Sequence, residues 1–255
     1  MKNNENWWKE TFSETYYSLW NHEESSSPNI KKRKNEGLDF LTLLNLKKGS
    51  NLLDLACGPG RHSINLAQKG FKVTGVDYSS AALKIAKKLT KVNDVSVTFL
   101  KKDIRLLDLK QKFEAVFLLG NSFGYFIDKD NKKVIKNIAK HLKKDGYFII
   151  HTLNPLQVIS EDEKNKISEH KILGGKLKMK LISFDPNTFV RKSVWEITKD
   201  GEKKNMDVIL RLYTVPEIKR MLLEEGLEIK KVFGSLDLSP YVTDSPSLII
   251  LAKKK

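Results

Sequence analysis

The sequence predicts an α/β domain built on a doubly wound sheet of seven strands, with an antiparallel β-meander inserted before the last helix. Three observations support this prediction. Short apolar runs alternate along most of the chain with longer segments whose apolar residues recur at helical spacing. A glycine-rich turn follows the first of these runs. Between about residues 167 and 214 the apolar period changes to two, which indicates strands joined by tight turns.

The first strand and its turn form the stretch Asn51–Ser63, which reads N-L-L-D-L-A-C-G-P-G-R-H-S. An apolar run ends in Asp54, Gly58 and Gly60 punctuate the turn, and a helical segment follows. Strand, glycine turn and helix form the nucleotide pocket of doubly wound domains. Glycines are needed there because the loop bends through positive φ and because a Cβ would collide with a ligand lying against the backbone.

The glycine turn differs from the two common phosphate-binding loops. It lacks the lysine of a phosphate loop. Ser63 occupies the position where a dinucleotide-binding loop has Gly or Ala, so the match to that loop is only partial.

Two further acids follow the next two predicted strands. The second strand ends in Asp77, about twenty residues after Asp54, where an acid can accept both ribose hydroxyls of an adenosine. The third strand, Val95–Leu100, leads to Asp103 and Ile104. Three acids at three successive strand ends therefore predict an adenosine pocket.

The fourth and fifth strands also end in polar residues. Glu114–Leu119 is nearly all apolar, as expected for a central parallel strand, and continues into the polar and aromatic stretch Gly120–Phe126. A helix closing at Asp145-Gly146 leads to the fifth strand, Tyr147–His151, which ends at Asn154-Pro155. Polar side chains at the carboxyl end of a buried strand are expected to face the pocket.

The remaining elements flank this core. At the N-terminus, Phe12, Tyr16 and Trp20 recur on one face of a predicted helix, and a second helix is expected from about residue 31 to 47. The meander is predicted from strands 176–183, 188–197 and 206–213. The last helix opens at Pro216 and closes at Gly226, and the last two strands are 228–233 and 248–253.

Composition limits the class of protein. The formal net charge is +15, but the lysines occur as scattered pairs, which favours a solvated surface over a nucleic-acid-binding stripe. The one cysteine, Cys57, excludes an intrachain disulfide and fits a cytoplasmic setting. No apolar run reaches about eighteen residues, so no membrane span and no membrane partner are expected. We predict no metal site.

The pattern Asp54-x-Ala56-x-Gly58-x-Gly60 resembles motif I of class I S-adenosylmethionine (SAM) methyltransferases, with Ala56 in place of the first glycine. The resemblance implies a Rossmann-like seven-stranded class I methyltransferase fold, SAM as cofactor and S-adenosylhomocysteine as product. The family's adenine clamp corresponds to Asp103 and Ile104. The implied cofactor-binding residues are Asp54, Ala56, Gly58, Gly60, Asp77, Tyr78, Asp103, Ile104, Leu119, Asn121 and Ser122.

Two stretches, Leu119–Phe123 and Gly234–Tyr241, resemble glycine N-methyltransferase and its small-molecule relatives. In that group the first stretch lies beside the sulfonium and the acceptor amine. The group's histidine at the end of that stretch is Tyr125 here. Leu153 occupies the place of an arginine that holds the glycine carboxylate, so no carboxylate anchor is expected there.

Candidate catalytic residues are Asn121, Tyr125 and His151, and candidate substrate contacts are Tyr125, His151, Asn154 and Tyr213. Tyr125 and His151 are chosen because an amine must shed a proton before attack and an alcohol needs a base. Both side chains are expected at strand ends facing the pocket.

The sequence therefore predicts a methyltransferase of a small molecule, with an amine nitrogen as the leading acceptor. Methyl transfer to tRNA or rRNA, suggested by the basic charge, and small-molecule O-methylation are the alternatives. Residues 1–48 are expected to cover part of the active site, residues 49–160 and 214–255 to bind SAM, and residues 161–213 to form a substrate-side lid or dimer contact. The protein is expected to be a cytoplasmic monomer or homodimer.

Overall fold

The computed structural model describes residues 6–19, 40–164, 166–172, 175–199 and 201–255. Its main sheet has seven strands in the order β10-β11-β5-β4-β1-β2-β3. β11 is antiparallel to both of its neighbours, and the pairs among β1 to β5 are parallel. The strands are β1 (Asn51–Leu55), β2 (Lys72–Asp77), β3 (Val97–Lys101), β4 (Phe113–Leu118), β5 (Leu142–Thr152), β10 (Leu227–Phe233) and β11 (Leu248–Lys254). The predicted seven-stranded α/β sheet is confirmed.

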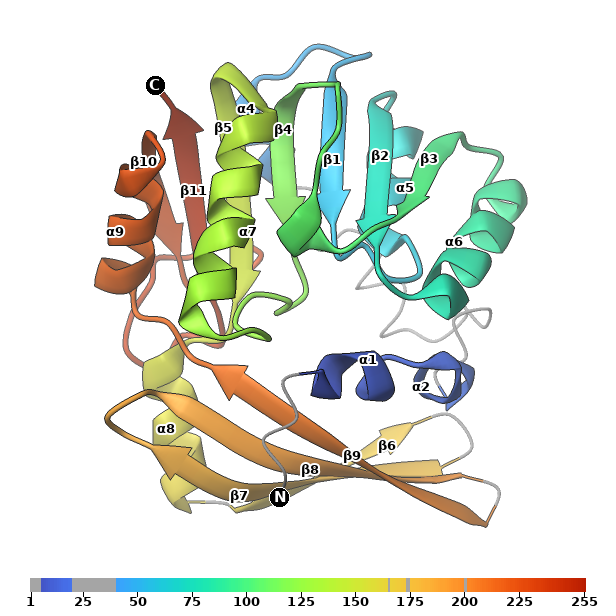
Figure 1. The fold of residues 1–255 in the computed structure, drawn as a ribbon, viewed down its shortest axis with the longest axis vertical. Coiled ribbons are helices and arrows are strands. Elements are labelled where there is room, and N and C mark those ends of the chain that lie inside the picture. The colour runs from blue at the N-terminus through green and yellow to red at the C-terminus, as the bar shows by residue number, and fades with distance from the viewer. Residues whose placement is uncertain (1–5, 20–39, 165, 173–174, 200) are drawn as a thin grey trace.

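Helices cover both faces of this sheet (Figure 1). On one face, α7 (Asp128–His141) and α9 (Val215–Glu224) pack on apolar strand residues that include Leu53. On the other, α4 (Phe40–Leu44) and α5 (Arg61–Gln68) pack on a set that includes Leu52. Successive strand residues therefore enter different cores, as period-two geometry requires. At the sheet edge, α6 (Ser80–Val92) lies against β3, and the single turn η1 is Ile104–Leu106.

The predicted antiparallel insertion is confirmed, and it is larger than expected. It has four strands in sequential order, β6 (Ile167–Ile172), β7 (Gly175–Asp185), β8 (Val190–Lys199) and β9 (Glu202–Arg211). Strand β6 and the preceding helix α8 (Pro155–Lys164) were not predicted, because both are short and polar and give little periodic signal. Figure 1 shows the insertion facing the carboxyl ends of the parallel strands.

The N-terminal segment lies between the two sheets (Figure 1). The expected single helix over Phe12 and Tyr16 is wrong: α1 (Trp7–Thr11) ends where Phe12 leaves helical geometry, and α2 (Glu14–Leu19) starts again. The side chain of Thr11 donates to the backbone oxygen of Asp207 on β9 at 2.8 Å. Trp20 and the predicted helix before residue 40 lie outside the described residues.

The start of β5 also differs from the prediction. The helix before it was expected to close at Asp145-Gly146, but the strand begins at Leu142, directly after α7. The pairing register with β4 jumps between Leu142 and Tyr147, and Asp145 adopts φ +62° within this bulge.

Within the described chain, no helix combines the length and apolar character needed to cross a membrane.

Candidate active site

The turn after β1 is a series of left-handed backbone positions. Ala56, Gly58 and Gly60 have φ values of +50°, +54° and +81°. A Cβ on Gly60 would lie 2.9 Å from Phe99 Cζ, so both the backbone angle and the packing require glycine there. Ala56 adopts a conformation that costs an L-residue energy, which explains why glycine is the usual residue at this position of the motif.

The carboxylate of Asp77 joins this turn to the start of α6. One oxygen accepts from the backbone N–H of Gly58 at 2.8 Å and the other from that of Ser79 at 2.8 Å. Burial raises the pKa of Asp77, and the hydrogen bonds from these backbone N–H groups oppose the rise. A buried carboxylate held from both sides is fixed in position at the carboxyl end of β2.

Asp54 lies beneath the turn. Its side chain is buried and accepts from the hydroxyl of Ser63 on α5 at 2.6 Å. Burial raises the pKa of Asp54 to about 7. The Asp54 side chain therefore joins β1 to the start of α5 and supports the glycine turn between them.

The third predicted acid, Asp103, is already paired. Its side chain caps η1, and its oxygens accept from the Arg105 guanidinium at 3.1, 3.1 and 2.7 Å. The expectation that Ile104 packs on an adenine ring does not match its position: Ile104 is buried in the core beneath α7, and its carbonyl accepts from Asn137. Sequence analysis missed Arg105 because an arginine after an acid gives no signal by itself.

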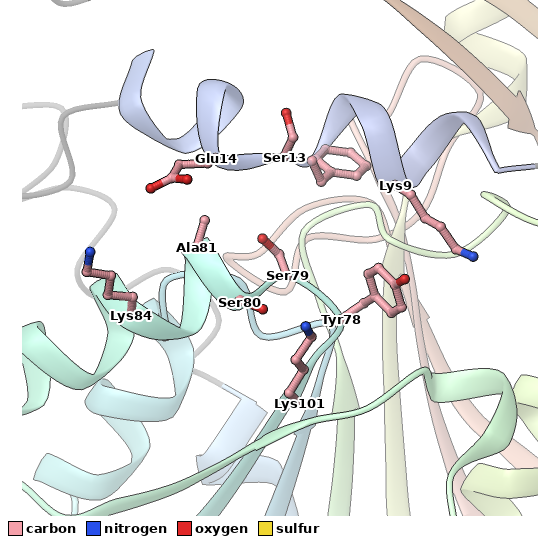
Figure 2. Close-up of a pocket in the computed structure, with 10 residues that line it drawn as sticks. Lys9, Ser13, Glu14, Tyr78, Ser79, Ser80, Ala81, Lys84 and Lys101 are labelled. Carbon is pink, nitrogen blue, oxygen red and sulfur yellow. The ribbon is translucent and has the colours of Figure 1, made fainter.

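Tyr78 follows Asp77 and is 40% exposed. Beside it lies a hollow of about 310 Å³ between the N-terminal helices and the start of α6. Figure 2 shows Lys9 and Glu14 at its α1–α2 side and Ser79 at its α6 side. Tyr78 and Ser79, the two residues that follow Asp77, line this hollow.

The end of β4 presents an unpaired oxygen. Asn121 has φ +64°, and its backbone N–H donates to the carbonyl of His151 at 3.1 Å. Its Oδ1 is buried and has no hydrogen-bond partner among the described residues. Next to it, a Cβ on Gly120 would meet no described atom within 4 Å, so there is space at this strand end. Leu119 itself is buried in the core, and Ser122 Oγ lies 3.5 Å from the Leu119 carbonyl oxygen.

Comparison with known proteins agrees with this geometry. Residues 52–146 match the family described as "Methyltransferase domain". The chain is 28% identical over 256 residues to glycine/sarcosine N-methyltransferase of Aphanothece halophytica, covering 96% of this chain and 89% of that protein.

Two solved structures have a similar fold. An S-adenosylmethionine-dependent methyltransferase from Clostridium acetobutylicum has a TM-score of 0.78 at 20% identity, covering 94% of this chain and 98% of that one. The CcbJ methyltransferase from Streptomyces caelestis has the same TM-score at 18% identity, covering 96% and 98%. Residues 52–146 are therefore a methyltransferase domain, and the chain has the fold of SAM-dependent methyltransferases.

In the methyltransferase, Tyr125 lies in the stretch after β4 and His151 lies near the end of β5, both in buried surroundings. Tyr125 stacks on Phe12 at 5.2 Å between ring centroids and meets Trp7 edge-on at 5.3 Å. Burial raises the pKa of Tyr125. His151 Nε2 lies 3.0 Å from Ser247 Oγ, and burial, assisted by the charge of Arg61, lowers the pKa of His151 to about 4.

Asn154 lies in the scaffold. Its amide nitrogen donates to the backbone oxygens of Val242, Thr243 and Ser245, and its oxygen accepts from the hydroxyl of Tyr241. A fully buried amide with these partners fixes the loop before β11, so it is not placed as the predicted substrate contact.

Tyr213 is also in the scaffold. Its hydroxyl donates to Asp128 at 2.6 Å and accepts from Asn131 at 2.9 Å, and its ring packs on Phe123 in the main core. The predicted substrate contact therefore serves to join the end of the insertion to α7.

Sequence analysis did not single out Tyr17. In the methyltransferase it is buried on α2, and a Cβ on Gly58 would lie 3.9 Å from its hydroxyl. Burial raises the pKa of Tyr17, and the Asp77 carboxylate adds to the rise. The aromatic run Tyr16-Tyr17 was the available signal. Tyr16 packs on Phe12, whereas the Tyr17 hydroxyl lies beside the Gly58 turn, and sequence spacing does not separate these two roles.

Proposed function

We propose that this methyltransferase transfers the SAM methyl group to the nitrogen of a small-molecule amine, leaving S-adenosylhomocysteine. The observation that carries the proposal is the buried, unpartnered Oδ1 of Asn121 at the end of β4. A buried acceptor without a donor costs about 1–3 kcal/mol, and an N–H on the substrate would supply that donor. An amine that donates an N–H to this oxygen would have its lone pair directed away from the oxygen and available to attack the methyl group.

The cofactor would be held on the β1–β2 side. The fit rests on Asp77, which is fixed at the end of β2, and on the left-handed turn at Gly58 and Gly60. Asp77 would accept from ribose hydroxyls, and Tyr78 and Asp103 would bound the adenine. The remaining predicted contacts, Asp54, Ala56, Ile104, Leu119 and Ser122, would act by shaping the turn and the strand ends. Bound SAM supplies an electrophilic methyl on a positively charged sulfur.

The acid–base groups favour an amine over an alcohol. His151, with its pKa lowered to about 4, is neutral near pH 7 but a weak base, and the raised pKa of Tyr125 keeps that phenol protonated. An alcohol acceptor needs a stronger base than either. An amine loses its proton to solvent before it is enclosed, and then needs only to be held close and in line.

The surrounding elements are proposed to enclose the acceptor. Tyr125 is packed against Trp7 and Phe12 from α1 and its end, and Thr11 attaches this segment to β9 of the insertion. We propose that residues 1–48 and 161–213 together form the acceptor-side cover, while residues 49–160 and 214–255 bind SAM. The name of the Aphanothece relative, an N-methyltransferase, supports a nitrogen acceptor. Leu153 argues against glycine itself, because it offers no cation for a carboxylate.

The test is release of S-adenosylhomocysteine from SAM in the presence of a library of small amines, each paired with the alcohol of the same skeleton, with total tRNA as a separate arm. We expect turnover with one or more amines and none with the paired alcohols. Turnover with an alcohol alone would support O-methylation. Turnover with tRNA alone, weakening steeply with added salt, would overturn the small-molecule proposal.

A further inference from the structure

Arg105 connects three elements around the proposed adenosine site. Its guanidinium binds Asp103 at the end of β3 through Nε and Nη2, and binds Asp130 on α7 through Nη1 at 3.0 Å. The side chain is 19% exposed. These paired hydrogen bonds fix the plane of the guanidinium, which a lysine would not do.

The guanidinium also lies over two aromatic rings. The Arg105 Cζ atom lies 5.2 Å from the ring centroid of Trp8 and 4.6 Å from that of Phe126. The two rings meet edge-on at 5.4 Å. A cation–π contact of this kind contributes about 0.5–2 kcal/mol, depending on burial. Arg105 therefore joins Asp103 and Asp130 by hydrogen bonds and contacts Trp8 of α1 by a cation–π interaction.

Trp8 extends this contact to the cofactor side. Its ring meets Tyr78 edge-on at 4.8 Å, directly after the proposed ribose acid Asp77. Trp8 is 5% exposed, yet its indole N–H has no acceptor among the described residues. A buried unpaired donor is unfavourable, so packing and the Arg105 contact must hold the ring in place.

We propose that Arg105 is a positioning residue that fixes α1 over the adenosine end of the SAM site. It holds Trp8 against Tyr78 and at the same time fixes the carboxylate of Asp103. This inference rests on the proposed binding of adenosine beside Tyr78 and Asp103. Loss of Arg105 should release α1 and weaken SAM binding without unfolding the sheet.

The structure offers a matched control on the same acid. Lys133 binds the other oxygen of Asp130 at 2.8 Å, but its side chain is 49% exposed and no stacking contact joins it to Trp8. Lys133→Gln removes a cation from Asp130 and leaves α1 untouched. Arg105→Lys keeps a cation beside the rings and loses the paired hydrogen bonds.

The experiment measures SAM affinity by calorimetry and local hydrogen exchange of the full chain, so it needs no methyl acceptor. For Arg105→Gln we expect a rise in Kd for SAM of about tenfold, equal to about 1.4 kcal/mol. Arg105→Lys should recover part of the loss, and Lys133→Gln should stay close to wild type. Exchange should speed up in α1 (Trp7–Thr11) and stay unchanged in β1 and β4.

Three outcomes would overturn the inference. One is a SAM affinity of Arg105→Gln equal to that of Lys133→Gln, and another is exchange that rises in β1 and β4 as much as in α1. If Arg105→Gln does not fold, Trp8→Leu takes its place, and wild-type SAM affinity in that variant is the third. A wild-type chain that binds no SAM would overturn the proposed function itself, which separates the two failures.

Discussion

The cofactor side and the acceptor side of this methyltransferase are held together by contacts of different range. On the cofactor side, Asp77 binds backbone groups 2 and 19 residues away in the chain. On the acceptor side, Thr11 of α1 binds the backbone of Asp207 on β9, 196 positions away. Contacts of short range leave a pattern in the sequence, whereas those of long range exist only once the two sheets have assembled.

The largest effect is expected at Gly124, where the stretch after β4 contacts Arg211 at the end of the insertion. It has φ +101°, and a Cβ there would overlap the backbone carbonyl of Arg211, whose own N–H donates to Gly124 at 2.9 Å. We expect Gly124→Ala to lower the free energy of unfolding by about 3–5 kcal/mol, measured by urea denaturation. Gly201→Ala is the control, since it has φ +81° but meets no described atom within 4 Å. Equal losses in both variants would show that the junction is not constrained as described.

The second prediction concerns Asp54, the buried acid beneath the glycine turn, and the pH dependence of the free energy of unfolding. Burial raises its pKa from 3.8 to about 7, so the folded state keeps a proton that the unfolded chain releases. The resulting stability is present below pH 3.8 and is lost as the pH rises to about 7, by about 4 kcal/mol for a shift of this size. Asp54→Asn should therefore gain stability relative to wild type by about that amount across this range, measured by urea denaturation at each pH.

The pH dependence of stability that His62 and His151 contribute has the opposite sign to that of Asp54. Burial lowers the pKa of His62 to about 3 and that of His151 to about 4, so their contribution is complete above pH 6.5 and is lost as the pH falls toward these values. Both histidines are present in wild type and in Asp54→Asn, so they cancel in the difference between the two. Parallel stability curves would contradict the assignment of Asp54 as a buried neutral acid.

Asp77 tests the cofactor side itself. Asp77→Ala removes the proposed acceptor of the ribose hydroxyls, and we expect SAM affinity to fall by about 1.5–3 kcal/mol in calorimetry. Asp145→Ala is a matched control, because that acid is exposed and lies on the β5 bulge. Unchanged affinity in Asp77→Ala would remove the ribose assignment.

Asn121 tests where the cofactor side ends and the acceptor side begins. Asn121→Ala should lower kcat about tenfold while SAM affinity changes less than about twofold, because its free oxygen is proposed to orient the acceptor. Steady-state rates with an amine from the library and calorimetry with SAM measure the two effects. Equal losses in both would move Asn121 to the cofactor side.

The sequence predicted the core of the fold well for a physical reason. Strand–helix alternation and the turn at Gly58 and Gly60 depend on local periodicity and backbone angles, so the seven-stranded sheet was expected before the structure. Helix α8 and strand β6 were missed because their short, polar sequences give little periodic signal. Asn154 and Tyr213 were predicted as substrate contacts, and the structure shows both hydrogen-bonded to the scaffold. The sequence does not show how many hydrogen bonds a polar side chain already makes.

The sequence alone determined the order of strands and helices, the glycine turn and the placing of acids at successive strand ends, because each follows from spacing along a few residues. The tertiary structure decided which polar groups stay free: it pairs Asp103 with Arg105, buries Asp54 on Ser63 and leaves Asn121 Oδ1 unpartnered. It also brings Trp8 and Tyr17 of the N-terminus against the ends of β2 and β1. The contacts of Trp8 and Tyr17 join residues far apart in the chain, and their energy exists only when both partners are buried together.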